Sequence, residues 1–246
     1  MKTTDSENDR RILKRDGEPW LFQPITFRSV TSRNRIAVSP MCQYSAVDGM
    51  PDDWQLVHLG ARAVGGAGIV FTEATHVEAR GRITPGCLGL WNDDQADAFR
   101  RIVDFVGAQG AVPAIQLAHA GRKASVSLPW EGTRPLMPDA GGWDVIGPSA
   151  LAYTRDHSVP LEMDQGEIDS VIDAFIAATR RALGVGFQLM ELHCAHGYLV
   201  HEFLSPLSNH RTDDYGGDLA GRSRFLMDLI DGVRSVWPDD LPLFIR

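Results

Sequence analysis

The chain has 246 residues, of which 43% are hydrophobic and 23% are charged, and its formal net charge is -8. This composition is ordinary for a globular protein with one sizeable core, so we expect a single folded domain. The acidic balance, with 24 basic residues spread along the chain, argues against a nucleic-acid surface and favours small molecules as partners.

Targeting signals are not visible in the sequence. No window approaches the roughly 18 consecutive apolar residues of a membrane span, and the polar start lacks the apolar core of a signal peptide. We therefore expect a cytoplasmic protein without a membrane partner. The three cysteines, Cys42, Cys87 and Cys194, are widely spaced, which predicts reduced thiols rather than disulfides or a zinc site.

The N-terminal region divides into two parts. Residues 1–19 are polar and charged, and we expect them to form a flexible arm. Two extended segments then follow, 21–27 and 35–41, on either side of the polar stretch 29–34. This arrangement predicts a β-hairpin that leads into a buried strand.

Short apolar runs alternate with segments of helical period through the rest of the chain. Strands are expected at 36–41, 69–74, 112–117, 187–192 and 243–246. Helices are expected at about 53–64, after Asn92 or Asp93 as far as Gly110, at about 164–183, and over the apolar stripe 225–233. Asp164 and Glu167 have the spacing of a capping box.

Strands that alternate with helices predict a parallel sheet, either doubly wound or a (β/α)8 barrel. A dinucleotide fold would place GxGxxG directly after its first strand, and no such run follows Met41. A TIM barrel is therefore favoured. The candidate strands begin about 50 residues apart, so eight units would need roughly 400 residues, and we expect this chain to reach only about the fifth strand.

The ends of parallel barrel strands carry the active sites of this fold. Here they carry a polar and aromatic set: Pro40, Met41, Cys42, Tyr44, Glu73, Ala74, Gln116, His119, His193, His196, Tyr198 and Arg246. A metal site at the histidine pair lacks an obvious third ligand. Two imidazoles can instead hold a carbonyl oxygen that becomes electron-rich, with Tyr198 as proton donor, and a purely structural pair is the alternative.

Five segments resemble motifs of the Old Yellow Enzyme family. The longest, at 191–218, reads ELHCAHGYLVHEFLSPLSNHRTDDYGGD, and SPMCQYS at 39–45 is similar to the thermophilic-like class of these ene-reductases. GRIT with LGLW, IQLAHAGRK and PLFIR match in the same order. The resemblance covers essentially everything from Leu21 onward, which we expect to be one FMN-binding TIM barrel with an N-terminal hairpin over 20–246.

The resemblance implies an FMN-dependent ene-reductase in which NADPH or NADH reduces the flavin. The flavin would then pass hydride to Cβ of an activated alkene, and Tyr198 would protonate Cα. His193 and His196 would bind the substrate carbonyl, and Tyr44 would line the substrate pocket. The residues implied to contact the flavin are Ser39, Pro40, Met41, Cys42, Ala74, Gln116 and Arg246, the last of these beside the negative charge of the reduced ring.

Three further expectations concern the surroundings of this site. Residues 120–163 form a connection far longer than usual, so we expect a lid over the flavin. His119 and Arg122 are expected to support the following loop, and the polar residues of the long motif to form a hydrogen-bonded scaffold: His201, Glu202, Asn209, His210, Arg211 and 213–217.

The flavin phosphate would be held by barrel units beyond Arg246, according to the resemblance. An alternative function therefore stays open at this point: a non-catalytic partial barrel, or a flavin-binding fragment completed by another chain. A half-barrel exposes two strand edges, which favours a homo-oligomer.

Overall fold

The computed structural model describes residue 17 and residues 19–246, so most of the arm expected over 1–19 lies outside the described residues. The central sheet contains β3 (Ala37–Val38), β4 (Ile69–His76), β5 (Val112–Ala118), β8 (Leu189–Leu192) and β9 (Leu243–Ile245). All neighbouring pairs are parallel, and the strands follow one another in chain order. A doubly wound sheet would reverse its order at a switch point. The predicted barrel, present through its fifth strand, is confirmed.

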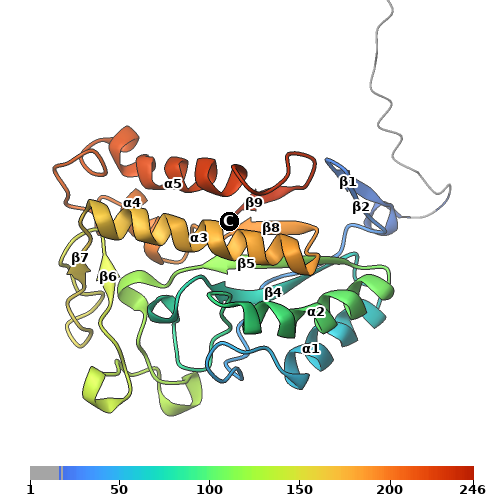
Figure 1. Cartoon of the computed structure of the whole chain (residues 1–246), viewed down its shortest axis with the longest axis horizontal. Helices are drawn as coiled ribbons and strands as arrows, with labels where there is room; N and C mark the ends of the chain where they lie inside the picture. The colour runs from blue at the N-terminus through green and yellow to red at the C-terminus, as the bar shows by residue number, and fades with distance from the viewer. Residues whose placement is uncertain (1–16, 18) are drawn as a thin grey trace, which may run out of the picture.

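Four long helices connect consecutive strands, as predicted: α1 (Asp53–Val64), α2 (Asp93–Ala108), α3 (Gln165–Val185) and α5 (Leu219–Arg234) (Figure 1). Asp52 and Asn92 begin α1 and α2 with reciprocal capping boxes, which satisfy backbone donors at each helix start. The box expected at Asp164 forms only in part. Asp164 accepts the amide of Glu167 at 2.8 Å, but the Glu167 carboxylate pairs with Arg80 at 2.5 Å instead.

Several short elements escaped the sequence pattern. Helix α4 (Leu199–Leu204) has six residues inside a polar motif, too few for a helical period to be recognised. The long connection after β5 contains a small parallel pair, β6 (Ile146–Gly147) with β7 (Leu161–Glu162). The 3-10 turns are Trp20–Phe22, Ala79–Gly81, Gly121–Lys123, Pro129–Glu131 and Pro138–Ala140.

The predicted hairpin exists, but its predicted pairing was wrong. β1 (Ile25–Phe27) pairs with β2 (Val30–Ser32), and Phe27 lies opposite Val30, so the turn contains only Arg28 and Ser29. Arg28 has the left-handed φ of 54° that such tight turns require. The polar stretch 29–34 was predicted to be the turn, but it contains the second strand. Its Ser32 is buried, and the Ser32 hydroxyl donates to the backbone oxygen of Asn34. The segment after it pairs with β4 instead.

The two faces of the sheet have different partners. The face toward the helices joins the main core, where Ile115 and Met190 pack with helix residues such as Phe175. The opposite, inner face carries a small apolar cluster: Val30, Ile69, Phe71, Val112, Ala114 and Leu189. The hairpin closes this cluster, with Phe27 edge-on to Phe244 at 5.1 Å. Figure 1 shows the hairpin at one end of the molecule and β6–β7 at the other.

An irregularity in β4 sets which side chains reach the inner face. Phe71 pairs with Ala114 and Ala74 pairs with Gln116, so β4 takes three steps where β5 takes two. This is the geometry of a β-bulge, which shifts the alternation of side chains beyond it. Ala74 therefore lies level with Gln116, in a row that continues to Glu191 and Phe244.

The buried imidazole of His76 should make the stability of the fold depend on pH. Nδ1 lies 3.1 Å from the Leu88 oxygen, Nε2 has no partner among the described residues, and burial lowers the pKa to about 3. Above pH 6.5 the imidazole is neutral in both the folded and the unfolded chain. Below it only the unfolded chain takes up the proton, so stability should fall by up to about 1.4 kcal/mol per pH unit toward pH 3.

Urea unfolding of the wild type and His76→Gln at a series of pH values measures this contribution. The difference between the two free energies of unfolding should shrink as the pH falls from about 6.5 to about 4. Glu73, whose pKa is raised by burial, acts in the opposite direction but equally in both proteins. A difference independent of pH would contradict the assignment.

No helix in the described part of the chain has the length and apolar character needed to cross a membrane.

Candidate active site

The two predicted histidines and the predicted tyrosine meet directly after β8. The His193 ring lies 4.9 Å from the His196 ring and 5.0 Å from the Tyr198 ring, measured between centroids and edge-on in both cases. His193 is 4% exposed, whereas His196 is open to solvent. His196 adopts a left-handed φ of 59°, which turns the chain into Tyr198 at the start of α4. In the described residues no three His, Cys, Asp or Glu side chains are grouped as metal ligands.

Hydrogen bonds define how the two imidazoles can donate. The Ala195 amide donates to Nδ1 of His193 at 3.3 Å, so the proton of a neutral His193 lies on Nε2. That nitrogen is 3.1 Å from Nδ1 of His196, which must then accept. His196 consequently carries its proton on Nε2, where a ligand can reach it. We expected both imidazoles to donate a hydrogen bond to one substrate oxygen. His193 could do so only if its hydrogen bond to His196 were broken.

Electrostatics keep this pair neutral. Burial is the main cause that lowers the pKa of His193 to about 4, with smaller contributions from His196, Arg246 and Lys123. The pKa of His196 is also lowered, first by the partial loss of solvent around its ring and then by the charges of Arg246 and Lys123. Neutral imidazoles can donate a hydrogen bond to a developing oxyanion without becoming competing acids.

The loop after β3 brings two further predicted residues to the same place. Cys42 and Tyr44 are half-buried and pack, together with Tyr198, against a small cluster that includes Cys87. Tyr44 has a left-handed φ of 54°. Burial raises the pKa of the Tyr44 and Tyr198 hydroxyls and of the Cys42 thiol far above their usual values. All three groups therefore stay protonated at neutral pH.

The predicted flavin contacts lie in or directly after four strands of the central sheet, namely β3, β4, β5 and β9. Ser39 and Met41 are exposed beside half-buried Pro40, whereas Ala74 and Gln116 are buried. The Gln116 amide donates to the Glu191 carboxylate at 2.5 Å across neighbouring strands.

Arg246 is fixed by its backbone. Its amide donates to the Leu192 oxygen at 3.1 Å, and its own oxygen accepts the Cys194 amide at 2.9 Å. Its positive charge couples to both histidines of the pair.

Lys123 is a functional candidate that the sequence alone did not single out. Its ammonium donates to the backbone oxygen of His196 at 2.8 Å, which holds the left-handed residue in place. It also lies over two rings, 4.7 Å from Tyr153 and 5.1 Å from Tyr198. Such cation–π contacts are favourable and directional. The only signal in the sequence was a basic residue five positions after an apolar strand.

Removing the Lys123 charge should raise the pKa values of both site histidines, because its positive charge disfavours imidazolium nearby. In Lys123→Met, NMR titration of the imidazole protons should show both midpoints at higher pH than in the wild type. Lys123→Arg retains the charge and serves as the control. Unchanged midpoints in Lys123→Met would contradict a role for Lys123 in keeping the pair neutral.

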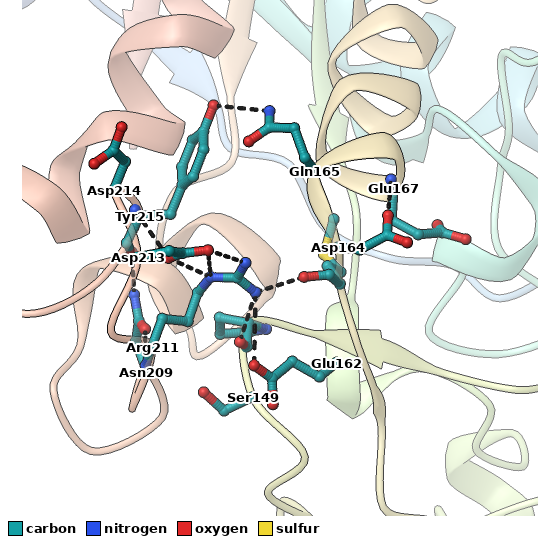
Figure 2. A network of polar contacts seen from close by, with 12 residues as sticks. Ser149, Glu162, Asp164, Gln165, Glu167, Asn209, Arg211, Asp213, Asp214 and Tyr215 are labelled. Atoms are coloured by element: carbon teal, nitrogen blue, oxygen red, sulfur yellow. Dashed lines mark hydrogen bonds and ion pairs between the residues drawn. The ribbon is translucent and has the colours of Figure 1, made fainter.

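The long motif after β8 forms the hydrogen-bonded scaffold that was predicted (Figure 2). Buried Arg211 donates to the backbone oxygens of Pro148 and Met163 at 3.0 and 2.5 Å, and it pairs with Asp213. Asn209 donates to the oxygens of Phe203 and Tyr215. The network therefore ties the motif to the segments around β6 and β7.

The expected supports of the loop after β5 also make contacts. His119 accepts the Gly121 amide at 3.0 Å through Nδ1 and lies 2.8 Å from Glu78 through Nε2. Arg122 donates to the Leu151 oxygen at 3.0 Å. These residues hold the segment that presents Lys123.

The sequence model of the NADH:flavin oxidoreductase / NADH oxidase family matches residues 20–246, which is nearly the whole chain. The chain belongs to this family. Its predicted resemblance to the Old Yellow Enzyme family is thereby confirmed, and so are FMN and NADPH or NADH as the cofactors of the family.

Curated members of the family are similar in sequence. The chain is 43% identical to an NADH:flavin oxidoreductase of Gibberella zeae over 94% of its own length and 57% of that protein. It is 44% identical to the NADPH dehydrogenase of Bacillus subtilis over 92% of its own length and 62% of that enzyme. The chain thus spans less than two thirds of these relatives.

Solved structures of similar proteins share the arrangement described above. Morphinone reductase superposes with a TM-score of 0.81 at 28% identity, over 92% of this chain and 62% of that one. The old yellow enzyme homologue from Zymomonas mobilis gives a TM-score of 0.80 at 29% identity, over 92% and 63% of the two chains.

Proposed function

We propose that this chain supplies the flavin-ring and substrate half of an FMN-dependent ene-reductase acting on α,β-unsaturated carbonyl compounds. The observation that carries the proposal is the meeting of His193, His196 and Tyr198 beside Cys42 and Tyr44, in a chain of this family. Free cysteines and an acidic composition favour a cytoplasmic location as part of the same proposal.

The residues at the strand ends fit a flavin ring. Gln116 offers an amide, and Ala74 offers a methyl group beside it. The Arg246 guanidinium would lie beside the anionic edge of the ring, although its charge also couples to the Glu191 carboxyl group. Gln116, Ala74 and Arg246, with Ser39, Pro40, Met41 and Cys42, would hold the ring. When bound, FMN supplies the hydride that it takes from NAD(P)H.

The chain's own groups then perform the proton chemistry. The Nε2–H of His196 binds the substrate carbonyl oxygen, and His193 holds that tautomer through the bond between the rings. Charge that develops on the oxygen is stabilised by this donor. Tyr198, which burial keeps protonated, delivers its hydroxyl proton to Cα. Residues 120–163 act as the lid, because Tyr153 from this segment contacts Lys123 beside Tyr198.

Flavin binding followed by turnover tests the proposal. Purified protein is incubated with FMN, freed of excess, reduced anaerobically with NADPH and then mixed with cyclohexenone. We expect the flavin absorbance to bleach with NADPH and to return with the enone. A protein that binds and reduces FMN, but is not reoxidised by the enone, would contradict the ene-reductase assignment.

A second candidate is a flavin-binding fragment completed by another chain. The open sheet supports it, because β3 and β9 are each paired on one side only among the described strands. Such edges favour association. Sedimentation with and without FMN distinguishes the two candidates: a flavin-free monomer without activity would contradict both, and flavin bound only to an oligomer would support the second.

A further inference from the structure

Glu73 is a buried carboxyl group to which the proposed chemistry gives no task. It lies in β4, whose eight residues are all buried, and only 3% of its surface is exposed. Its position coincides with the bulge between Phe71 and Ala74. A carboxyl group placed in such a strand is unfavourable unless its partners compensate for the lost water.

The partners of Glu73 lie in the loop that carries Cys42 and Tyr44. Oε2 accepts the backbone amide of Gln43 at 3.0 Å, between those two residues. The Tyr44 amide and the Gln55 side chain also interact with the carboxyl group. Tyr44 has the left-handed backbone noted above, a conformation that persists only where the surroundings hold it. The carboxyl group is thus the anchor beneath this turn.

The second oxygen is left without compensation. Oε1 is buried and has no hydrogen-bond partner among the described residues. Burial raises the pKa of Glu73 to about 7, although the Gln43 hydrogen bond and the nearby Gln55 and Tyr44 donors oppose this. The titratable groups coupled to its charge are the thiols of Cys42 and Cys87, whose pKa values it raises. The protonation of one carboxyl group is therefore coupled to the thiol that faces the site.

We propose that Glu73 is a positioning residue: its carboxyl group holds the Gln43–Tyr44 backbone so that Cys42 and Tyr44 are presented to the flavin and the substrate. The proposal rests on the proposed function for its purpose. Its mechanical part, that Glu73 fixes Cys42, can be tested without flavin or substrate.

The rate at which iodoacetamide alkylates Cys42 reports both the loop and the carboxyl charge. A thiol far below its pKa should react about tenfold faster per pH unit, because only the thiolate attacks. In the wild type we expect the alkylation rate to rise less steeply with pH around pH 7. There Glu73 ionises, and its negative charge disfavours the Cys42 thiolate. Peptide mass spectrometry separates Cys42 from Cys87 and Cys194, which are buried.

Two substitutions separate anchoring from charge. Glu73→Gln retains an acceptor for the Gln43 amide and should keep Cys42 protected, with the increase now uniform at about tenfold per pH unit. Glu73→Ala removes the anchor and should raise the rate about tenfold or more at every pH. If Glu73→Ala does not fold, Glu73→Asp tests the anchor instead, because its shorter side chain draws the acceptor away from the Gln43 amide and should raise the Cys42 rate in the same direction.

Thr75→Val is the matched control. Thr75 is fully buried two residues along the same strand, and its hydroxyl bonds only to Thr72 and to the Glu73 backbone. We expect it to lower stability but to leave the Cys42 profile as in the wild type. The positioning role is overturned if removing the anchor leaves the Cys42 rate at the wild-type value, or if Thr75→Val exposes Cys42 equally. The coupling to the carboxyl charge is rejected separately if Glu73→Gln keeps the flattening near pH 7. None of these outcomes depends on alkene reduction.

Discussion

Replacing Tyr198 by phenylalanine should lower the rate of alkene reduction by about 10²- to 10⁴-fold, the usual contribution of a positioned general acid. The hydroxyl is the group that would protonate Cα, and burial keeps it protonated. The ring itself packs edge-on against His193 at 5.0 Å, so phenylalanine preserves the shape of the site. Reduction of the flavin by NADPH requires no proton from Tyr198 and should change little.

Stopped-flow measurement of the two half-reactions separates these effects. The matched control is Tyr153→Phe, which removes a hydroxyl from the other ring that lies beneath the Lys123 ammonium. It should leave both half-reactions within a few-fold of the wild type. An equal loss in both half-reactions of Tyr198→Phe would show damage to flavin binding and would remove Tyr198 from the acid role.

Replacing Arg211 by methionine should lower the free energy of unfolding by about 2 to 4 kcal/mol. Arg211 is 9% exposed and donates to the backbone oxygens of Pro148 and Met163, which lie 63 and 48 residues earlier in the sequence. Methionine fills similar space but donates nothing, so both oxygens lose their charged donor in a buried place. Asp213, whose pKa Arg211 lowers, loses its cation as well.

Urea unfolding of the wild type and variants measures this difference. Arg224→Met provides the control, because Arg224 belongs to the neighbouring α5, is exposed and donates only to the Asp214 oxygen at 2.8 Å. Its effect should stay within about 0.5 kcal/mol. Equal losses in the two variants would mean that the network of Figure 2 contributes no more than an ordinary surface arginine.

The sequence predicted what depends on local pattern. The five strands of the central sheet and the four long helices followed from apolar runs and periodicity, and α1 occupies the predicted residues 53–64. Asn92 caps α2 because its side chain needs only the next three residues to make its bonds. The order of the strands followed from the absence of GxGxxG after the first strand, which favoured a barrel over a doubly wound sheet.

Features that depend on distant partners could not be predicted. Glu167 had the right spacing for a capping box, but Arg80, 87 residues away, takes its carboxylate. Which atoms of His193 and His196 carry protons depends on the Ala195 amide and on the left-handed turn at His196. Glu73 looked like one more polar residue at a strand end, since its partners in the loop after β3 become visible only when the strands pair.

The bulge in β4 decides which side chain lies level with Gln116 at the proposed flavin site. Without the extra residue, Glu73 rather than Ala74 would lie opposite Gln116, since strict alternation would follow from the Phe71–Ala114 pair. A second carboxyl group would then join Glu191 in this row and would add to the repulsion of an anionic ring at the proposed flavin site. With the extra residue, the Glu73 carboxyl group instead accepts a hydrogen bond from the loop after β3, and the Ala74 methyl group lies beside Gln116.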